Sequence, residues 1–146
     1  MFAKIVTLIQ KSLESNDIAL ELPRQKDIKI VTYPNQLIQV LINIINNAKD
    51  AIKQSNKKDG LIRISLRRDK KHITISICNN GDEIEPSIKE RLGQPYVSTK
   101  SKNGTGLGVY MSKVIVTKHL GGNLYWESDK SKTCFYIELP NADKEF

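Results

Sequence analysis

A row of amide side chains is the first feature of this chain that could do chemistry. Between residues 34 and 52, amide and carboxylate side chains recur at three- and four-residue spacing: Gln39, Asn43, Asn46, Asn47 and Asp50. This spacing places them on one face of a helix. Asparagine is a poor helix former because its short amide competes for backbone hydrogen bonds, so the row needs an explanation. A solvated face is the simpler one; the other is a row of carbonyl oxygens that face a hard cation and the phosphates it carries.

A glycine-rich segment later in the chain could bind an anion. It runs from Gly104 to Gly108 as Gly-Thr-Gly-Leu-Gly and opens a predicted helix. No Gly-Lys-Ser/Thr follows, which excludes a Walker A loop, and the absence of a preceding strand and the G-x-G-x-G spacing exclude a dinucleotide fingerprint. Glycines let a backbone approach an anion, and free N–H groups at a helix N-terminus bind phosphate. A structural loop is the alternative, but this segment together with the amide row predicts a phosphate site.

Periodicity predicts the elements that must position these groups. Apolar residues at helical spacing predict helices, alternating ones predict strands, and Gly, Pro and Asn mark turns. The predicted helices are 2–13, 34–52, a short piece at 87–92, and one that opens at Leu107 and stops at Gly121-Gly122. The predicted strands are 18–22, 28–33, 62–66, 73–77, 124–127 and 134–139. The long stretch before Leu107, with little periodicity, is typical of a lid or binding loop.

Length and composition indicate a single domain. The 146 residues, 39% of them hydrophobic, suit one domain over 1–146, with 1–15 as an entry helix or the remnant of a preceding helical hairpin domain. The net charge of +7 indicates an anionic partner without naming it. Aromatic residues, at 6%, are not interleaved with Lys and Arg, so no nucleic-acid partner is expected.

Cysteine usage and hydropathy give expectations about the compartment. Cys78 and Cys134 match no metal spacing and no disulfide framework, so reduced thiols in a cytoplasmic protein are expected. No signal peptide and no apolar run of membrane length is visible, so no direct membrane contact is expected.

In their order and residue sequence, the motifs resemble the catalytic and ATP-binding domain of bacterial sensor histidine kinases. Those domains belong to the superfamily shared with DNA gyrase, a heat-shock chaperone and the mismatch-repair ATPases. The resemblance covers about residues 28–140 and is carried by five segments: 39–48 (QVLINIINNA), 79–84 (NNGDEI), 95–100 (PYVSTK), 104–108 (GTGLG) and Gly121-Gly122. It implies the Bergerat fold, an α/β two-layer sandwich in which a mixed sheet of about five strands packs against three helices, with an ATP lid.

The resemblance also implies roles for single residues. Asn47 matches the family's magnesium-binding asparagine, with Asn43 as its polar partner near the phosphates, while Asp50 either binds water in that shell or faces solvent. Lys100 matches the lid lysine that meets the phosphates. Thr133 fits a threonine near the adenine, or is an ordinary strand threonine. The ATP-binding set that follows is Asn43, Asn47, Asp50, Asn79, Gly81, Ile84, Ser98, Thr99, Lys100, Gly104, Thr105, Gly106, Leu107, Gly108 and Thr133.

The chain departs from the family pattern at the turn after residue 78. Where the family has Asp-x-Gly-x-Gly, this chain has Asn79 at the Asp position and Glu83 at the second Gly. An amide offers a donor as well as an acceptor and can flip, so looser base selectivity and lower affinity are hypotheses, which a comparison of ATP with GTP tests. Glu83 adds a charge near the nucleotide. The family's aromatic lid residues appear as Leu92 and Tyr96, a milder change.

The resemblance implies part of a kinase. Such kinases transfer the γ-phosphoryl group of ATP to a histidine on a separate helical dimerisation domain, next to an acidic base. Of the two histidines here, His72 lies at a hairpin turn and His119 near a helix end, which indicates structural roles. We therefore expect a monomeric domain that binds ATP and Mg²⁺, does not autophosphorylate alone, and acts with that helical domain and, indirectly, a response regulator. A cytoplasmic location is expected, in a parent protein that could be membrane-anchored.

Two other classes compete with this interpretation. A stand-alone anti-sigma-type serine kinase shares the superfamily and the size, but would carry acidic side chains where this chain has Gln39 and Asn43. A degenerate module that has lost nucleotide and serves protein interaction is suggested by Asn79 and Glu83.

Overall fold

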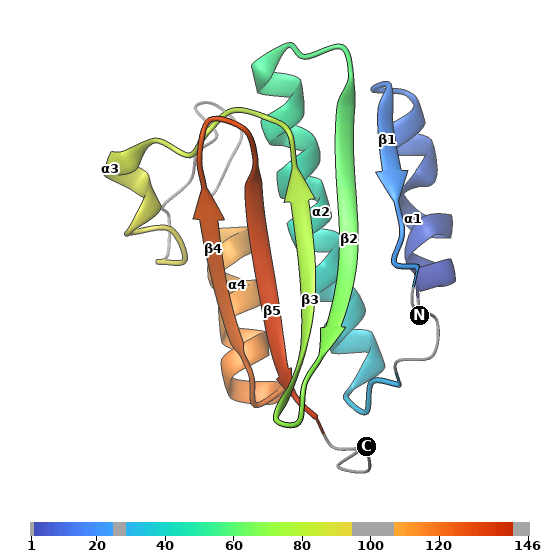
Figure 1. The fold of residues 1–146 in the computed structure, drawn as a ribbon, viewed down its shortest axis with the longest axis vertical. Coiled ribbons are helices and arrows are strands. Elements are labelled where there is room, and N and C mark those ends of the chain that lie inside the picture. Colours follow the sequence, from blue (N-terminus) through green and yellow to red (C-terminus); the bar gives the residue numbers. More distant parts are fainter. Residues whose placement is uncertain (1, 25–28, 95–106, 142–146) are drawn as a thin grey trace.

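A mixed five-stranded sheet forms one layer of the molecule (Figure 1). The computed structural model describes residues 2–24, 29–94 and 107–141. Within them the strand order is β1-β2-β3-β5-β4, with β1 parallel to β2 and the other neighbours antiparallel. The strands are β1 (Ile18–Glu21), β2 (Gly60–Arg68), β3 (His72–Asn79), β4 (Asn123–Ser128) and β5 (Thr133–Pro140). This order brings the C-terminal end of β3 beside the start of β5, where the predicted base-binding residues lie.

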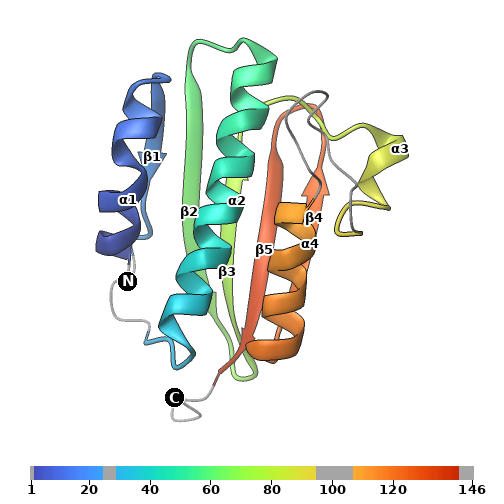
Figure 2. The ribbon, with the colours of Figure 1, turned by 180° about the vertical axis from the view of Figure 1, so that it is seen from behind.

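Three helices cover one face of the sheet, as Figure 2 shows from behind. They are α1 (Phe2–Glu14), α2 (Pro34–Ser55) and α4 (Leu107–Val114), and α4 continues as a π-helical turn, η1 (Ile115–His119). The short helix α3 (Pro86–Lys89) stands beyond the edge strand β4. The predicted two-layer α/β sandwich with three covering helices is therefore confirmed. None of the described helices is both long and apolar enough to cross a lipid bilayer.

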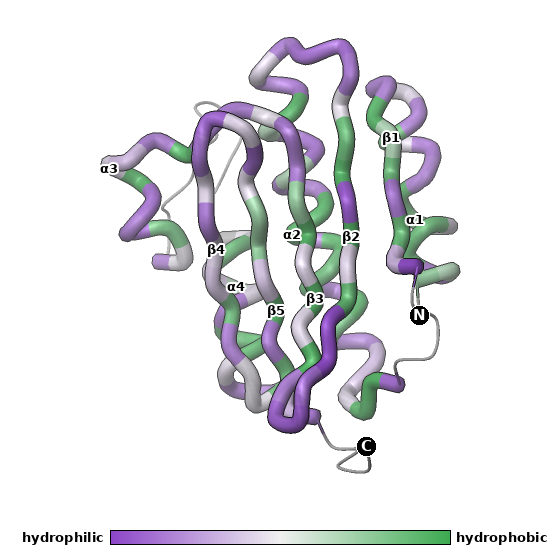
Figure 3. Tube along the Cα trace, viewed as in Figure 1, coloured by the Kyte–Doolittle hydropathy of each residue, from purple (hydrophilic) through white to green (hydrophobic). Residues whose placement is uncertain are grey.

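The central helix α2 forms because its sequence supplies both ends and one apolar face. Pro34 occupies the first helical turn, where its missing N–H is no loss, and Asn56 ends the helix in a left-handed conformation with φ 59°. Its apolar side chains pack against isoleucines of the central strands, and alternating hydropathy along those strands is visible in Figure 3. The fully buried contacts from α2 come from Leu37, Val40, Leu41, Ile44 and Ile45. Burial of each such side chain stabilises the fold by roughly 1.5–3 kcal/mol.

Residues 28–33 do not form the predicted strand. Ile28 lies outside the described residues, and residues 29–33 connect the β1 side of the sheet to the start of α2 without entering the sheet. Val31 and Tyr33 are 59% and 64% exposed. β-Branched and aromatic residues favour strands only where a partner strand is available, and residues 29–33 have none in the described structure, although Ile30 packs partly against the core.

The two cysteines are bonded to each other, so the expectation of reduced thiols is wrong. Cys78 of β3 and Cys134 of β5 are direct partners in the antiparallel register, and they form a disulfide across a sequence separation of 56 residues. The bond lies on the sheet face opposite the helices, because its neighbours in the strands, Ile77 and Phe135, point into the core. Cysteine spacing could not reveal the pair, since it depends on the register of two strands far apart in sequence.

The glycine pair after η1 stops the helix as predicted, and the structure explains why both positions are glycine. Gly121 has φ +69°, a conformation that side chains with a Cβ rarely adopt. A Cβ on Gly122 would lie 2.0 Å from the backbone oxygen of Glu138, so only a bare backbone can pass β5 there. The Gly122 N–H then donates to the Val116 carbonyl.

The disulfide gives a first testable prediction. In protein purified without reductant and then denatured, we expect neither Cys78 nor Cys134 to react with iodoacetamide, as read by intact mass. A Cys134→Ser variant serves as the control and should show one labelled thiol. Reduction of the wild-type chain should lower its free energy of unfolding by about 2–4 kcal/mol, because the cross-link restricts the unfolded chain. Alkylation of both cysteines in the unreduced wild type would contradict the assignment.

Candidate functional site

The amide row of α2 contacts the neighbouring helix α4 through Asn43. The side-chain amide of Asn43 donates to the hydroxyl of Ser112, on α4, at 3.3 Å, and Ser112 is fully buried. Asn47 and Asp50, one and two turns further on, are half-buried, whereas Gln39 at the start of the row is exposed. Among the described residues, no hydrogen-bond partner is found for the Asn47 amide. The middle of the row is thus partly enclosed, which does not fit the solvated-face alternative.

The turn after β3 is fixed by Asn79 and packed against α2. Asn79 is 3% exposed, and its side-chain carbonyl oxygen accepts the Gly81 N–H at 2.9 Å. A Cβ on Gly81 would lie 2.8–2.9 Å from backbone atoms of Ala51 and Ile52 in α2. Because the donor at Gly81 requires an oxygen, the Asn79 amide cannot flip without leaving a buried N–H unpaired. The structure therefore differs from the freely flipping amide considered from the sequence.

Thr133 lies next to this turn and is held by a serine that the sequence analysis missed. Thr133 is the register partner of Asn79 on one side and of Ser128 on the other. The hydroxyls of Ser128 and Thr133 lie 2.6 Å apart, and the Ile84 N–H donates to the Ser128 hydroxyl at 2.9 Å. Ile84 thus enters the site through its backbone. No local motif marks Ser128, because the register of the β4–β5 hairpin places it here. Ser112 was missed for a similar reason, since the packing of α4 on α2 brings it to Asn43.

The segment around α3 is anchored to β4. The indole N–H of Trp126 donates to the Lys89 carbonyl at 2.9 Å, and the Lys89 ammonium donates to the Ser128 carbonyl at 2.7 Å. The carboxylate of Glu83 lies 3.9 Å from the same ammonium. The charge that Glu83 introduces in place of the family's glycine therefore has a local counter-ion. Leu92, at the position of a family lid aromatic, is buried.

The N-terminus of α4 is directed toward the amide row and the turn after β3. Gly108 lies in its first turn, and a Cβ there would meet no atom within 4 Å, so packing does not demand glycine at this position. Free N–H groups at a helix start attract anions. The backbone of Leu107 begins the helix. The other predicted residues, Ser98, Thr99, Lys100, Gly104, Thr105 and Gly106, with Tyr96, lie outside the described residues, and their roles stay predictions.

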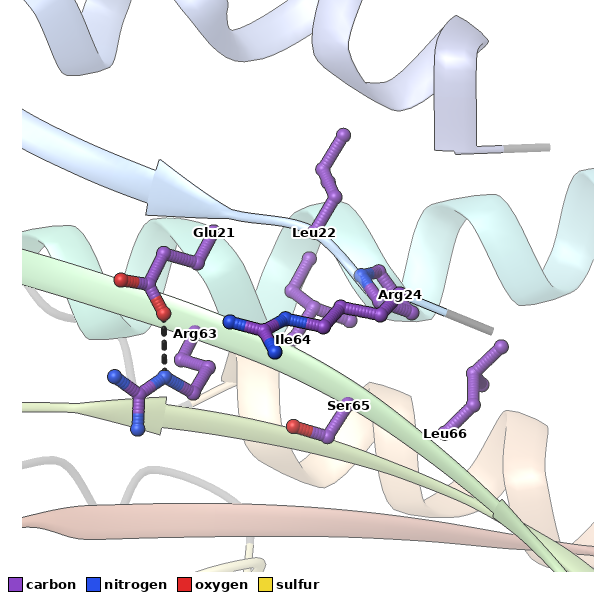
Figure 4. Close-up of a pocket in the computed structure, with 8 residues that line it drawn as sticks. Glu21, Leu22, Arg24, Arg63, Ile64, Ser65 and Leu66 are labelled. Carbon is purple, nitrogen blue, oxygen red and sulfur yellow. Dashed lines mark hydrogen bonds and ion pairs between the residues drawn. The ribbon is translucent and has the colours of Figure 1, made fainter. Parts of the chain in front are cut away.

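Described residues form two hollows, of which one lies away from this region and the other reaches its edge at Asn79. One, of about 780 Å³, lies beside the end of β1 and is crossed by a hydrogen bond from Arg63 to Glu21 (Figure 4). The other, of about 330 Å³, is beside the disulfide on the uncovered face of the sheet. Neither is lined by the amides of α2. The two histidines have surroundings of their own. His72 lies 3.7 Å from the Glu138 carboxylate, and His119 is exposed at the end of η1.

The contact between Gly81 and α2 predicts a difference between two glycines. We expect Gly81→Ala to lower the free energy of unfolding by about 1–3 kcal/mol, because the added methyl must push the turn away from the helix backbone. Gly108→Ala is the matched control and should leave stability unchanged or raise it by up to about 1 kcal/mol, since alanine favours helices. Urea denaturation followed by circular dichroism measures both. Equal stability of the two variants would contradict the close packing at Gly81.

Comparisons with known proteins agree with this arrangement. The family described as histidine kinase-, DNA gyrase B- and HSP90-like ATPase matches residues 32–143. Sporulation kinase E of Bacillus subtilis (strain 168) is 33% identical over 138 residues, which cover 92% of this chain and 18% of that protein. The sensory histidine kinase/phosphatase NtrB of Azospirillum brasilense is 32% identical over 121 residues, covering 75% of this chain and 30% of that protein. The chain thus spans less than a third of the length of either relative.

Solved structures show the same fold. The nucleotide-free catalytic domain of histidine kinase ThkA superposes with a TM-score of 0.82 at 25% identity, covering 94% of this chain and 88% of that one. A structure of ThkA in complex with response regulator protein TrrA gives a TM-score of 0.77 at 20% identity, covering 99% of this chain and 40% of that one. The chain therefore belongs to the histidine kinase-, DNA gyrase B- and HSP90-like ATPase family, and within it corresponds to the ATP-binding catalytic domain of two-component sensor histidine kinases.

Proposed function

We propose that this chain binds ATP together with Mg²⁺ between α2, the turn after β3 and the start of α4. As part of a longer kinase, it would present the γ-phosphate to a histidine on a separate helical dimerisation domain. The observation that carries the proposal is the half-buried amide row of α2, which lies beside α4 rather than in open solvent. A response regulator would be the indirect partner, as TrrA is in the structure of its complex with ThkA.

The residues of the row fit the metal that the family implies. Mg²⁺ takes oxygen ligands and keeps several waters, so one amide carbonyl from Asn47, with phosphate oxygens and water, is a suitable set. Asn43 uses its NH₂ group on Ser112, which leaves its carbonyl oxygen for that water shell. Asp50 could accept from the same waters. When bound, the metal neutralises charge on the phosphates, while the protein supplies position and electrostatics.

The base-binding end fits adenine. Asn79 keeps a second lone pair and its NH₂ group beyond the bond to Gly81, so it offers an acceptor beside a donor in a fixed order. Adenine presents its N6 amine next to the N1 acceptor, whereas guanine presents O6 next to the N1 donor. A fixed amide distinguishes these two edges better than one that is free to rotate.

Calorimetry with one substitution tests the metal and phosphate part. We expect a non-hydrolysable ATP analogue to bind in the micromolar range, about −8 kcal/mol, and only weakly without Mg²⁺. Asn47→Ala should weaken binding in Mg²⁺ by about tenfold or more, because the metal loses a ligand. Asn35→Ala, an exposed asparagine in the first turn of the same helix, is the control and should bind like the wild type.

Two results would count against the proposal. If the folded wild-type chain binds no nucleotide, the interaction-module alternative gains. If Asn47→Ala and Asn35→Ala bind equally well, Asn47 does not hold the metal.

With ATP bound, the chain alone should show no autophosphorylation. Phosphotransfer should appear only when the helical domain of a relative is added.

A comparison of ATP with GTP tests the base-binding part. Because Gly81 fixes the Asn79 amide, we expect the wild type to bind ATP about tenfold more tightly than GTP. Asn79→Ala should bind ATP less tightly and should reduce this ratio, which competition calorimetry measures. Similar affinity of the wild type for the two nucleotides would instead support the looser selectivity considered from the sequence.

A further inference from the structure

The hydroxyl pair of Ser128 and Thr133 has a direction that the surrounding hydrogen bonds determine. A serine or threonine hydroxyl has one hydrogen to donate and two lone pairs. The Ile84 N–H uses one lone pair of Ser128. With the two hydroxyl oxygens 2.6 Å apart, one of them donates to the other. Ser128 and Thr133 are 9% and 3% exposed, so an unpaired hydroxyl hydrogen on either would be costly.

The two possible assignments differ in which hydrogen is left over. If Thr133 donates to Ser128, the Ser128 hydrogen has no acceptor among the described residues, because the other partner of that hydroxyl, the Ile84 N–H, is a donor. If Ser128 donates to Thr133, the remaining hydrogen belongs to Thr133, which lies beside Asn79 at the base-binding end. The second order also forms a directed chain from Ile84 through Ser128 to Thr133, in which each bond polarises the next.

We propose that Ser128 is a positioning residue that sets the Thr133 hydroxyl as a hydrogen-bond donor to an acceptor nitrogen of the bound purine ring. This inference rests on the proposed ATP site and adds a residue that contacts no ligand itself. The ligand that this arrangement would take is a purine whose unprotonated ring nitrogen lies next to the Thr133 hydroxyl. Only a ligand atom with a lone pair completes the chain, so binding of such a ligand selects the second order.

A double-mutant cycle measured by calorimetry tests the proposal. We expect Ser128→Ala to weaken binding of the ATP analogue about three- to tenfold, since Thr133 loses the partner that directs its hydrogen. Ser128→Thr keeps the hydroxyl and should restore most of the affinity. Thr133→Val removes the donor, and in that background Ser128→Ala should have little further effect. Ser131→Ala is the control for the hairpin, because within the described residues the Ser131 hydroxyl bonds to Asp129 in the turn and lies outside the chain of hydroxyls.

Deaza analogues give the readout that a merely structural role would not change. The analogues are ATP molecules in which ring nitrogen N1, N3 or N7 is replaced by C–H. We expect one of them to bind the wild type more weakly than ATP binds the wild type. The Thr133→Val variant should bind that analogue and ATP with equal affinity. Ser128→Ala should shrink the penalty of that same analogue.

The outcomes separate this inference from the proposed function. If Ser128→Ala weakens ATP and every analogue equally and keeps its effect in the Thr133→Val background, Ser128 only supports the hairpin and the inference is wrong. Wild-type affinity in Ser128→Ala would also overturn it, with the ATP site intact. Failure of the wild type to bind ATP would overturn the proposed function itself.

Discussion

The packing of α2 on the central strands positions the amide row and the turn after β3, which form the first half of the candidate site. Its apolar face is held by the isoleucines of β2 and β3, so its polar face has a fixed place relative to the end of β3. The contact between Gly81 and the backbone of Ala51 brings the turn as close to the helix as a bare backbone allows. Asn79 is therefore placed by the same helix that carries Asn43 and Asn47. The residues that we propose to bind the base and the metal therefore share one support.

The second half of the site depends on the last hairpin. β4 and β5 bring Ser128 and Thr133 together, and Trp126 holds the α3 segment to β4 through the Lys89 carbonyl. Asp129 closes the turn between these strands, and the hydrogen bonds it accepts from Ser131 and Lys132 lower the pKa of its carboxyl group. The α3 segment is therefore hydrogen-bonded to the strand that carries Ser128.

Much of this structure could be predicted from local pattern, and the remainder depends on contacts between distant segments. Burial of one face of a helix or strand produces a periodic pattern of apolar residues, so helices and hairpins could be predicted. Examples are Leu37 to Ile45 of α2 and the alternating Ile73, Ile75 and Ile77 of β3. The pairing of Cys78 with Cys134 could not, because it follows from strand register. Ser112 and Ser128 carry no motif and acquire roles only through α4 packing and hairpin geometry. Val31 and Tyr33 misled the prediction, since strand preference without a partner strand is not enough.

The two departures from the family pattern each have a local partner, and this bears on whether the site is degenerate. A charge at Glu83 would repel phosphates if it stood alone, but the Lys89 ammonium lies 3.9 Å away and is itself bonded to the Ser128 carbonyl. An amide at Asn79 would lose direction if it could rotate, but the Gly81 N–H holds its oxygen. The bond from Gly81 to Asn79 also fixes the turn itself, as asparagine commonly does in turns, and the Glu83 carboxylate is paired locally. The two substitutions are therefore compatible with the nucleotide site proposed above, and neither requires that the site has lost its ligand.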